Sequence, residues 1–453
     1  MTNLKDQRSI LFATSISYIL VILDTSIVNV ALPRMGINLM ASITDLQWVV
    51  NSYVVIFASL LLSGGALCDK YGARRIYLIG LLIFGLASLA CGCSNTLAML
   101  LTGRILQGVG AALLIPSSLA LLTHAHHDNT ERARAIVTWT SWGGVALACG
   151  PFLGGILIEF FDWQSIFLVN VPISIAGIWL TLRTKQQEHC KTERVLDVFG
   201  QLAAIVALTS FIATMIEGST LGWTSLPIMT GIALSLLSGI IFVLIESKVT
   251  APMLPLSLCS NRNFSAISYI FFAGALCFFG ILFVLTFYFQ EVCKFSPLET
   301  GLAFFPLSLS VIIGNKISGH LVKTHPPRTI MLGGAILRVL GFLGMLVVFV
   351  DKSYGALIVP LCLIGIGGGL GAPMSTSLFL TSVDKAFTGI ASGISRATGQ
   401  IGSALGIAIF GALISDSKTL SNQMVPVVIV TTGLTMSIIF VTCFIIKDKN
   451  LAN

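Results

Sequence analysis

Two charged side chains lie inside stretches of sequence that are otherwise apolar. Asp24 occurs in VILDTSIVNVALP and Arg104 in LTGRILQGVG. If these stretches lie in lipid, a lone charge costs at least about 3 kcal/mol, so each group is expected to face the other or a water-filled cavity. Burial favours the neutral carboxyl, whereas a nearby guanidinium favours the carboxylate. A carboxyl between these opposing effects can take up and release a proton.

We therefore predict that Asp24 carries a proton and that Arg104 favours its deprotonated state in one conformation. Gln107, which lies nearly one helical turn after Arg104, is predicted to tune the local hydrogen bonds. At 1.5 Å per helical residue, Asp24 and Arg104 lie at similar depths of roughly 13 and 12 Å, so they can meet if their helices are neighbours. The alternative is a static structural ion pair.

The composition indicates the elements that must position these residues. The chain has 453 residues, of which 55% are hydrophobic and 10% charged, whereas soluble proteins have about 25% charged residues. Apolar runs of the roughly 20 residues that cross a bilayer recur along the chain, and the alternation of a β-barrel is not visible. The first run, about 10–32, is too long for a signal peptide core and is expected to be retained. The sequence predicts an all-α polytopic membrane protein.

Hydropathy and loop signals predict fourteen transmembrane helices. Their ranges are 10–33, 46–68, 76–93, 96–123, 135–159, 163–182, 198–217, 225–246, 265–289, 298–322, 329–350, 355–380, 387–415 and 425–446. With a cytoplasmic N-terminus, 18 of the 26 Lys and Arg residues fall in cytoplasmic segments and four in outer loops. Cytoplasmic loops are the ones enriched in basic residues. We expect both termini to be cytoplasmic, and we interpret the net charge of +7 as a topological signal rather than a nucleic-acid site.

Two pairs of similar segments indicate an internal repeat. GVGAALLIP at 108–116 resembles GIGGGLGAP at 365–373, and GALCDKYGAR at 65–74 resembles GHLVKTHPPR at 319–328. An even number of spans separates the copies, so the repeats run in the same direction through the membrane. We predict an N-terminal six-helix bundle at 9–182, a two-helix insert at 197–246 and a C-terminal six-helix bundle at 265–446.

Several motifs together resemble the major facilitator superfamily, specifically its fourteen-helix drug/proton antiporter branch, over essentially the whole chain. The segments that carry the resemblance are LDTSIVNVALP, LQWVVNSY, GALCDKYGARR, RILQGVGAA, ACGPFLGG, IESKVTAPMLPLSL and FSPLETGLAFFPL. The resemblance implies a major facilitator fold and the export of a small amphipathic molecule in exchange for protons. Relatives of this kind export quaternary ammonium compounds, methylenomycin and related antibiotics.

The resemblance also assigns roles to two groups of residues. It implies a cytoplasmic gate at Gly65, Asp69, Gly72, Arg74 and Arg75, and an antiporter motif at Gly150, Pro151, Gly154 and Gly155. In the gate, Asp69 is expected to contact the start of span 13 and a nearby arginine; the alternative is a solvated basic loop that serves only topology. In the antiporter motif and in GQIGSALG of span 13, the glycines are expected to form sliding contacts; the alternative is static helix packing.

Substrate contacts are predicted less directly. We expect Asn29, Trp48, Tyr53 and Arg396 to line the substrate cavity. Lys316, Arg338 and Arg396 lie within C-terminal spans that show no deep carboxylate, which favours an acidic substrate if these groups face the cavity. Lys316 and Arg338 could instead extend to the interface. HAHH at 124–127 is expected to be a solvated loop rather than a metal site.

The sequence shows no GxxxxGK[ST] phosphate loop and no HExxH or GxSxG, so neither ATP drive nor an enzyme is indicated. We predict a proton-coupled exporter in a bacterial-type cytoplasmic membrane, which works as a monomer with no cofactor except the proton gradient. Its expected partners are a small amphipathic substrate, the lipid bilayer and protons. The ten cysteines show no paired CxxC spacing and are expected to be core residues. Alternatives are a proton-coupled importer and a non-transporting sensor or lipid-handling protein.

Overall fold

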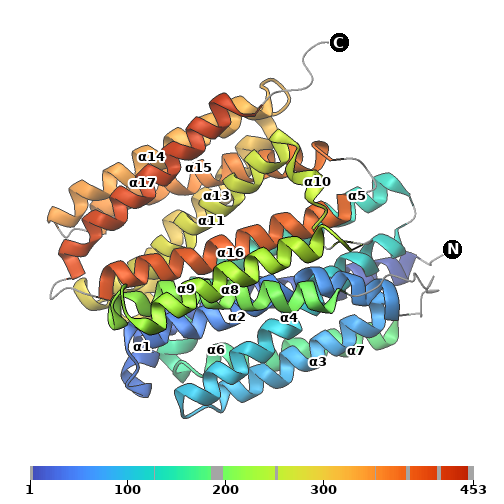
Figure 1. The fold of residues 1–453 in the computed structure, drawn as a ribbon, viewed down its shortest axis with the longest axis horizontal. Helices are drawn as coiled ribbons and strands as arrows, with labels where there is room; N and C mark the ends of the chain where they lie inside the picture. The colour runs from blue at the N-terminus through green and yellow to red at the C-terminus, as the bar shows by residue number, and fades with distance from the viewer. Residues whose placement is uncertain are drawn as a thin grey trace. The chain divides into compact units, whose positions relative to one another are not determined.

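The computed structural model describes residues 4–126, 128–184, 197–249, 252, 254–351, 354–383, 388–415 and 420–446. These residues form helices joined by short loops, without a β-strand among them (Figure 1). Fourteen spans in the described residues are long and apolar enough to cross a membrane. The prediction of an all-α protein with fourteen transmembrane helices is confirmed.

The first six spans contain seven helices. These are α1 (Leu4–Leu39), α2 (Ile43–Tyr71), α3 (Ala73–Gly92), α4 (Leu97–Ala125), α5 (Asn129–Phe161), α6 (Ser165–Leu168) and α7 (Asn170–Arg183). Helices α6 and α7 together make one span. Ser42 begins α2 with a capping box, since its hydroxyl accepts from the Asp45 amide while the Asp45 carboxylate accepts from the Ser42 amide. Gly72 adopts φ +92°, which suits glycine and lets α3 start directly after α2.

The next two spans are α8 (Val198–Leu221) and α9 (Leu226–Glu246), as the predicted insert requires. Gln201 of α8 is bound to α2, because its amide nitrogen donates to the Ser59 carbonyl and its amide oxygen accepts from the Ser63 hydroxyl. The chain divides into two compact units, 1–211 with 230–253 and 212–229 with 254–453. The functional division at 9–182, 197–246 and 265–446 stays a prediction.

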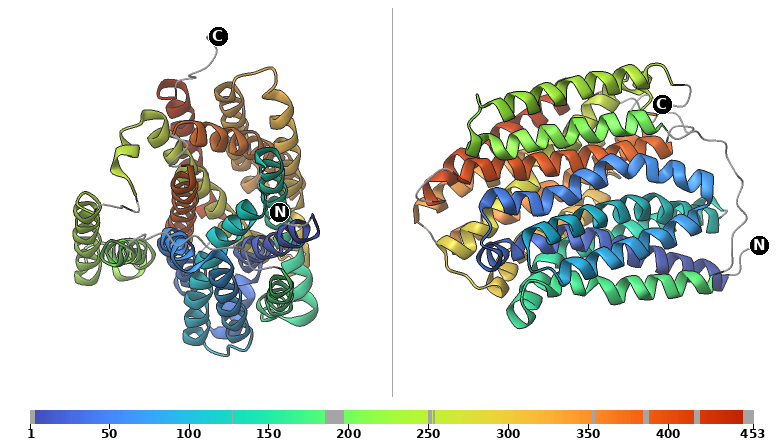
Figure 2. Two further views of the ribbon diagram at one scale, coloured as in Figure 1. Left: turned by 90° about the vertical axis from the view of Figure 1, so that its right-hand side faces the viewer. Right: turned by 60° about the horizontal axis from the view of Figure 1, so that its bottom comes forward.

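The described residues from 254 onward form eight α-helices and one π-helical turn, and all of these except α10 lie in the last six spans. They are α10 (Leu256–Cys259), α11 (Arg262–Phe287), η1 (Tyr288–Val292), α12 (Pro297–Ala303), α13 (Phe305–Leu321), α14 (Pro327–Asp351), α15 (Tyr354–Thr381), α16 (Thr388–Ser415) and α17 (Leu420–Phe444). Helix α11 continues into η1 as one span, and α12 with α13 makes another. The long helices of each unit lie side by side (Figure 2).

The glycines of the sequence repeat make equivalent contacts in the two units. Gly108 of α4 lies against the Tyr53 carbonyl of α2, and Gly365 of α15 lies against the Leu307 carbonyl of α13. Two residues later in each copy, Gly110 faces α3 and Gly367 faces α14. A β-carbon at any of these four positions would come within 3 Å of the neighbouring helix. The similar strings therefore encode the same helix packing twice.

A second set of glycines joins α5 to α1 and α16 to α11. In the antiporter motif, Gly150 lies against Ser26 and Gly154 against Ile27, both on α1. The corresponding contacts in the other unit are Gly402 with Phe272 and Gly406 with Leu276. Pro151 and Gly155 are buried in α5. These contacts show close packing at both seams, and sliding along them stays a prediction.

Candidate functional site

Asp24 and Arg104 form an ion pair inside the first unit. Asp24 Oδ2 lies 2.6 Å from Arg104 Nη1, and both side chains have 0% exposure. Asp24 comes from α1 and Arg104 from α4, and these two helices pack together. The structure thus brings together the two charged residues that were expected to meet if their helices were neighbours, and their depth in the membrane stays a prediction.

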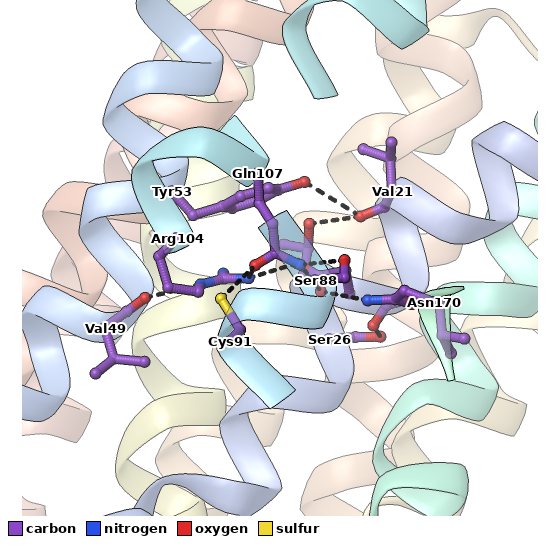
Figure 3. A network of polar contacts seen from close by, with 12 residues as sticks. Val21, Ser26, Val49, Tyr53, Ser88, Cys91, Arg104, Gln107 and Asn170 are labelled. Atoms are coloured by element: carbon purple, nitrogen blue, oxygen red, sulfur yellow. Dashed lines mark hydrogen bonds and ion pairs between the residues drawn. The ribbon is translucent and has the colours of Figure 1, made fainter. Parts of the chain in front are cut away.

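Two amide side chains complete the surroundings of the carboxylate. Gln107 Nε2 donates to Asp24 Oδ1 at 3.2 Å, and Asn170 Nδ2 donates to the same oxygen at 2.9 Å. Gln107 is itself held in place, because its oxygen accepts from Arg104 at 2.9 Å and its nitrogen also donates to Ser88 at 2.8 Å. Asp24 thus accepts hydrogen bonds from three side chains on two helices. Figure 3 labels these three donors, Arg104, Gln107 and Asn170.

Arg104 is held by contacts that do not involve Asp24. Its Nε donates to the Val49 carbonyl of α2 at 3.0 Å, and its guanidinium lies 4.3 Å from the centre of the Tyr53 ring. A second ring, that of Phe167, is 5.7 Å away. Such cation–π contacts stabilise a guanidinium, by about 2 kcal/mol when it is desolvated. Arg104 therefore has contacts with α2 and Phe167 that do not depend on the Asp24 carboxylate.

Two hydrogen-bonding positions of this network are open among the described residues. Arg104 Nη2 is buried and has no hydrogen-bond partner among the described residues. The oxygen of the Asn170 amide, whose nitrogen bonds Asp24, is in the same state. Both groups border the ion pair, so a water molecule or a moving proton would find a donor and an acceptor beside the carboxylate.

Sequence reasoning found Asp24, Arg104 and Gln107 but missed Asn170 and Ser88. Asn170 is the first residue of α7, directly after the short helix α6 ends. The available signal was a single amide within the apolar string FLVNVP. A fully buried polar side chain in a membrane helix is expected to have a partner inside the bundle.

The second repeat lacks the network. When Gly108 is aligned with Gly365, the residues opposite Arg104 and Gln107 are Leu361 and Ile364. The repeat therefore preserves the glycine packing while replacing the polar groups with apolar ones. The polar side chains predicted to take part in proton coupling therefore have no polar counterpart at these two positions of the second repeat.

Arg74, a predicted gate residue, ties α3 to α7. Its Nη2 donates to the carbonyls of Thr181, Leu182 and Thr184 at 3.1, 3.2 and 3.1 Å. These carbonyls lie at the C-terminal end of α7, where the helix dipole favours a positive charge. Arg74 thus has a structural role in addition to the predicted one.

The other gate residues surround the turn between α2 and α3. Asp69 is half-buried and Arg75 is exposed, while Gly65 lies 3.9 Å from Pro116 as measured from an added β-carbon. The predicted partner of Asp69 is the start of span 13, whose first predicted residue, 387, lies outside the described part of the chain. The latch between them stays a prediction.

The residues expected to line the substrate cavity occupy different environments. Tyr53 packs on Arg104, and Asn29 is buried with its Nδ2 donating to the Thr25 carbonyl at 3.2 Å. Trp48 and Arg396 are half-buried. Their contact with a substrate stays a prediction.

The other two charges of the C-terminal spans also differ. Lys316 is exposed, whereas Arg338 is half-buried and donates to the Gly274 carbonyl at 3.4 Å. The expectation that HAHH is a solvated loop is wrong in part, because His124 and Ala125 end α4 and His126 is buried. His127 lies outside the described residues. Among the described residues, no group of three or more His, Cys, Asp or Glu side chains could hold a metal ion.

Comparison with known proteins agrees with this architecture. Residues 14–407 match the family model described as Major Facilitator Superfamily. The chain is 34% identical over 412 residues to the methylenomycin A resistance protein of Bacillus subtilis, covering 91% of this chain and 88% of that one. It is 36% identical over 415 residues to the multidrug resistance protein Stp of Mycobacterium tuberculosis, covering 91% and 76%. A POT family transporter solved with a thioalcohol-conjugated peptide shares the fold, with a TM-score of 0.71, 15% identity and coverage of 97% and 96%.

Proposed function

The chain belongs to the Major Facilitator Superfamily, and on that premise we propose that it is a proton-coupled antiporter that exports a small amphipathic drug or metabolite. Family membership makes the chain a membrane transporter rather than an enzyme. The relatives named for resistance and for drug efflux favour export over import. Methylenomycin A is the first substrate to test, because it appears in the names of two relatives.

One observation carries the proton-coupled part of this proposal. A carboxylate at 0% exposure accepts hydrogen bonds from Arg104, Gln107 and Asn170. A static pair would need only Arg104, and the cost of burying both charges would make it a weak source of stability. Three donors on α4 and α7 allow the carboxylate form of Asp24 to hold these helices against α1.

The proposed exchange follows from what protonation changes. A proton on Asp24 removes the charge that attracts Arg104, while Arg104 keeps its bond to the Val49 carbonyl and its contact with the Tyr53 ring. The attraction between α1 and α4 then falls, and the balance between conformations shifts. Substrate that binds better to one of these conformations changes the affinity of Asp24 for its proton. Protonation of Asp24 changes the affinity for substrate by the same factor.

We place the protein in the cytoplasmic membrane of a bacterial cell with both termini inside, because basic residues concentrate in the segments that this orientation makes cytoplasmic. In this orientation Asp24 receives its proton from the outer side and delivers it to the cytoplasm. The proton gradient is then the sole energy source, and a single chain suffices for transport.

The experiment is a susceptibility assay in a host that lacks its own drug pumps. Expression of the chain is expected to raise the inhibitory concentration of methylenomycin A, and an uncoupler that collapses the proton gradient is expected to abolish the protection. Protection that survives uncoupling would exclude proton antiport. Greater sensitivity on expression would favour the importer instead.

A further inference from the structure

Asn51 of α2 is a buried amide whose two polar atoms are both unpaired. The residue has 0% exposure, and neither Oδ1 nor Nδ2 has a hydrogen-bond partner among the described residues. It lies within the span Ile43–Tyr71. Buried polar groups in proteins are nearly always hydrogen-bonded, so each exception calls for an explanation.

The usual way for a short polar side chain to satisfy itself in a membrane helix is to bond the carbonyl one turn earlier. Asn29 does this through Thr25, and Thr14 does it through Ile10. Asn51 makes no such bond in the structure. A leucine of similar size would avoid the unpaired donor and acceptor altogether, so the protein keeps this amide at a cost to its stability.

The depth of Asn51 is fixed by its neighbours on α2. The Val49 carbonyl accepts from Arg104, and the Tyr53 ring stacks on the same guanidinium. Asn51 lies midway between them in sequence, within about 3 Å of either along the helix axis, and therefore level with the ion pair. In transporters built from repeats, substrate sites lie near the middle of the bilayer.

The direction of Asn51 follows from helical geometry. Tyr53 faces Arg104, and two residues of helix rotate a side chain by about 200°. Asn51 thus projects from the side of α2 opposite the Asp24–Arg104 network. Helix α2 therefore contacts Arg104 on one face and presents the unpaired Asn51 amide on the opposite face.

We propose that the Asn51 carboxamide is a substrate contact that recognises an uncharged group carrying a hydrogen-bond donor and an acceptor side by side. A primary carboxamide, a lactam or an undissociated carboxylic acid has this pattern, and each would pair with Oδ1 and Nδ2 at once. A quaternary ammonium group has no donor or acceptor and gains nothing at this position. The inference rests on the proposed role as an exporter of small molecules and names the chemical class that Asn51 selects.

Substrate at Asn51 would act on the proton site through α2. A shift of this helix moves the Val49 carbonyl and the Tyr53 ring, which hold Arg104. Arg104 in turn contacts Asp24. The two ligands of the antiporter are thus linked by a single helix.

The test compares Asn51→Leu with the wild-type protein, both full length and reconstituted in nanodiscs. Ser15→Ala is the matched control, because the Ser15 hydroxyl on α1 is also buried without a partner among the described residues. The first measurement is the thermal unfolding midpoint. Both variants are expected to unfold at or above the wild-type midpoint, since each loses an unpaired polar group.

The second measurement is binding without a proton gradient, using three probes. They are 4-phenylbutanamide, its N,N-dimethyl derivative, which lacks the N–H donors, and 3-phenylpropyltrimethylammonium. Wild-type protein and Ser15→Ala are expected to bind the primary amide about tenfold more tightly than the dimethyl amide, the factor that about 1.4 kcal/mol gives. Asn51→Leu is expected to lose this preference while its affinity for the ammonium probe stays the same.

Three results would overturn the inference: a wild-type protein with no preference for the primary amide, a preference that survives in Asn51→Leu, or a lower unfolding midpoint in Asn51→Leu than in Ser15→Ala. The last result would show that the amide has a structural partner. Because no gradient is present, failure of proton coupling would leave these binding results unchanged and would appear only in the uncoupler assay.

Discussion

At the scale of single residues, the site depends on one carboxylate and the donors that surround it. Asp24 and Arg104 could be predicted from sequence, because a charge in an apolar span is conspicuous and helical rise gives its depth. The role of Asn170 could not be predicted from sequence. An asparagine in an apolar string can cap a helix, bond its own backbone or bond a neighbouring helix, and the sequence does not distinguish these cases. The break between α6 and α7, which sets its position, leaves no hydropathy signal.

Asn170 is expected to help hold α7 against α1 during exchange. Replacing it with leucine removes its hydrogen bond to the Asp24 carboxylate. A bond to a charged group contributes about 1.5 kcal/mol, about a tenfold factor in an equilibrium, so exchange should slow severalfold across the profile of rate against substrate concentration. The measurement is substrate exchange in proteoliposomes across a series of substrate concentrations.

The matched control for this variant is Asn38→Leu. Asn38 donates to the Asp162 carboxylate at 3.3 Å, but that pair lies on an exposed part of the protein. Its loss should leave the profile unchanged. Equal profiles for wild type and Asn170→Leu would remove Asn170 from the proton site.

At the scale of helices, glycine contacts determine how the elements pack. The fourteen spans could be predicted from hydropathy because lipid imposes length and apolarity on each of them. Their interruptions could not, namely the change from α11 to the π-helical η1 and the break between α12 and α13. These depend on local backbone geometry, to which average hydropathy is insensitive.

The contact between α1 and α5 gives a prediction at this scale. A β-carbon at Gly150 would collide with the Ser26 side chain, two residues after Asp24, whereas one at Gly144 of the same helix meets no described atom within 4 Å. Gly150→Ala is expected to lower exchange severalfold, and Gly144→Ala to leave it near the wild-type rate. Initial rates in proteoliposomes, normalised to folded protein, provide the comparison.

A second substitution tests the cause of that loss. Ser26→Gly removes the atoms nearest to the added methyl group, so the double variant with Gly150→Ala should recover part of the lost rate. At Gly402 the obstacle is the backbone carbonyl of Phe272, and trimming a side chain offers no equivalent relief. A double variant as slow as Gly150→Ala alone would argue against the steric explanation.

At the scale of the whole molecule, the distribution of basic residues predicts the orientation of every loop. The expectation that the cysteines are core residues is wrong for Cys93, Cys149 and Cys259, which are exposed. Two of them can report the orientation, since Cys93 follows α3 on the predicted outer side and Cys259 ends α10 on the predicted cytoplasmic side. Two variants are compared, in which Cys93 or Cys259 is the single cysteine left in the chain. An impermeant maleimide applied to intact cells should label the Cys93 variant and not the Cys259 variant. Permeabilised cells, in which both should react, provide the control; the reverse pattern in intact cells would invert the topology.

The most direct test of the central claim is proton movement by Asp24→Asn in proteoliposomes loaded with a pH-sensitive dye. The control is Asp162→Asn, whose carboxylate lies 3.5 Å from Arg34 in a half-exposed surface pair. Wild type and Asp162→Asn should move protons when methylenomycin A is added, and Asp24→Asn should bind the compound without moving protons. Undiminished substrate-driven proton movement in Asp24→Asn would contradict the assignment of Asp24 as the proton carrier.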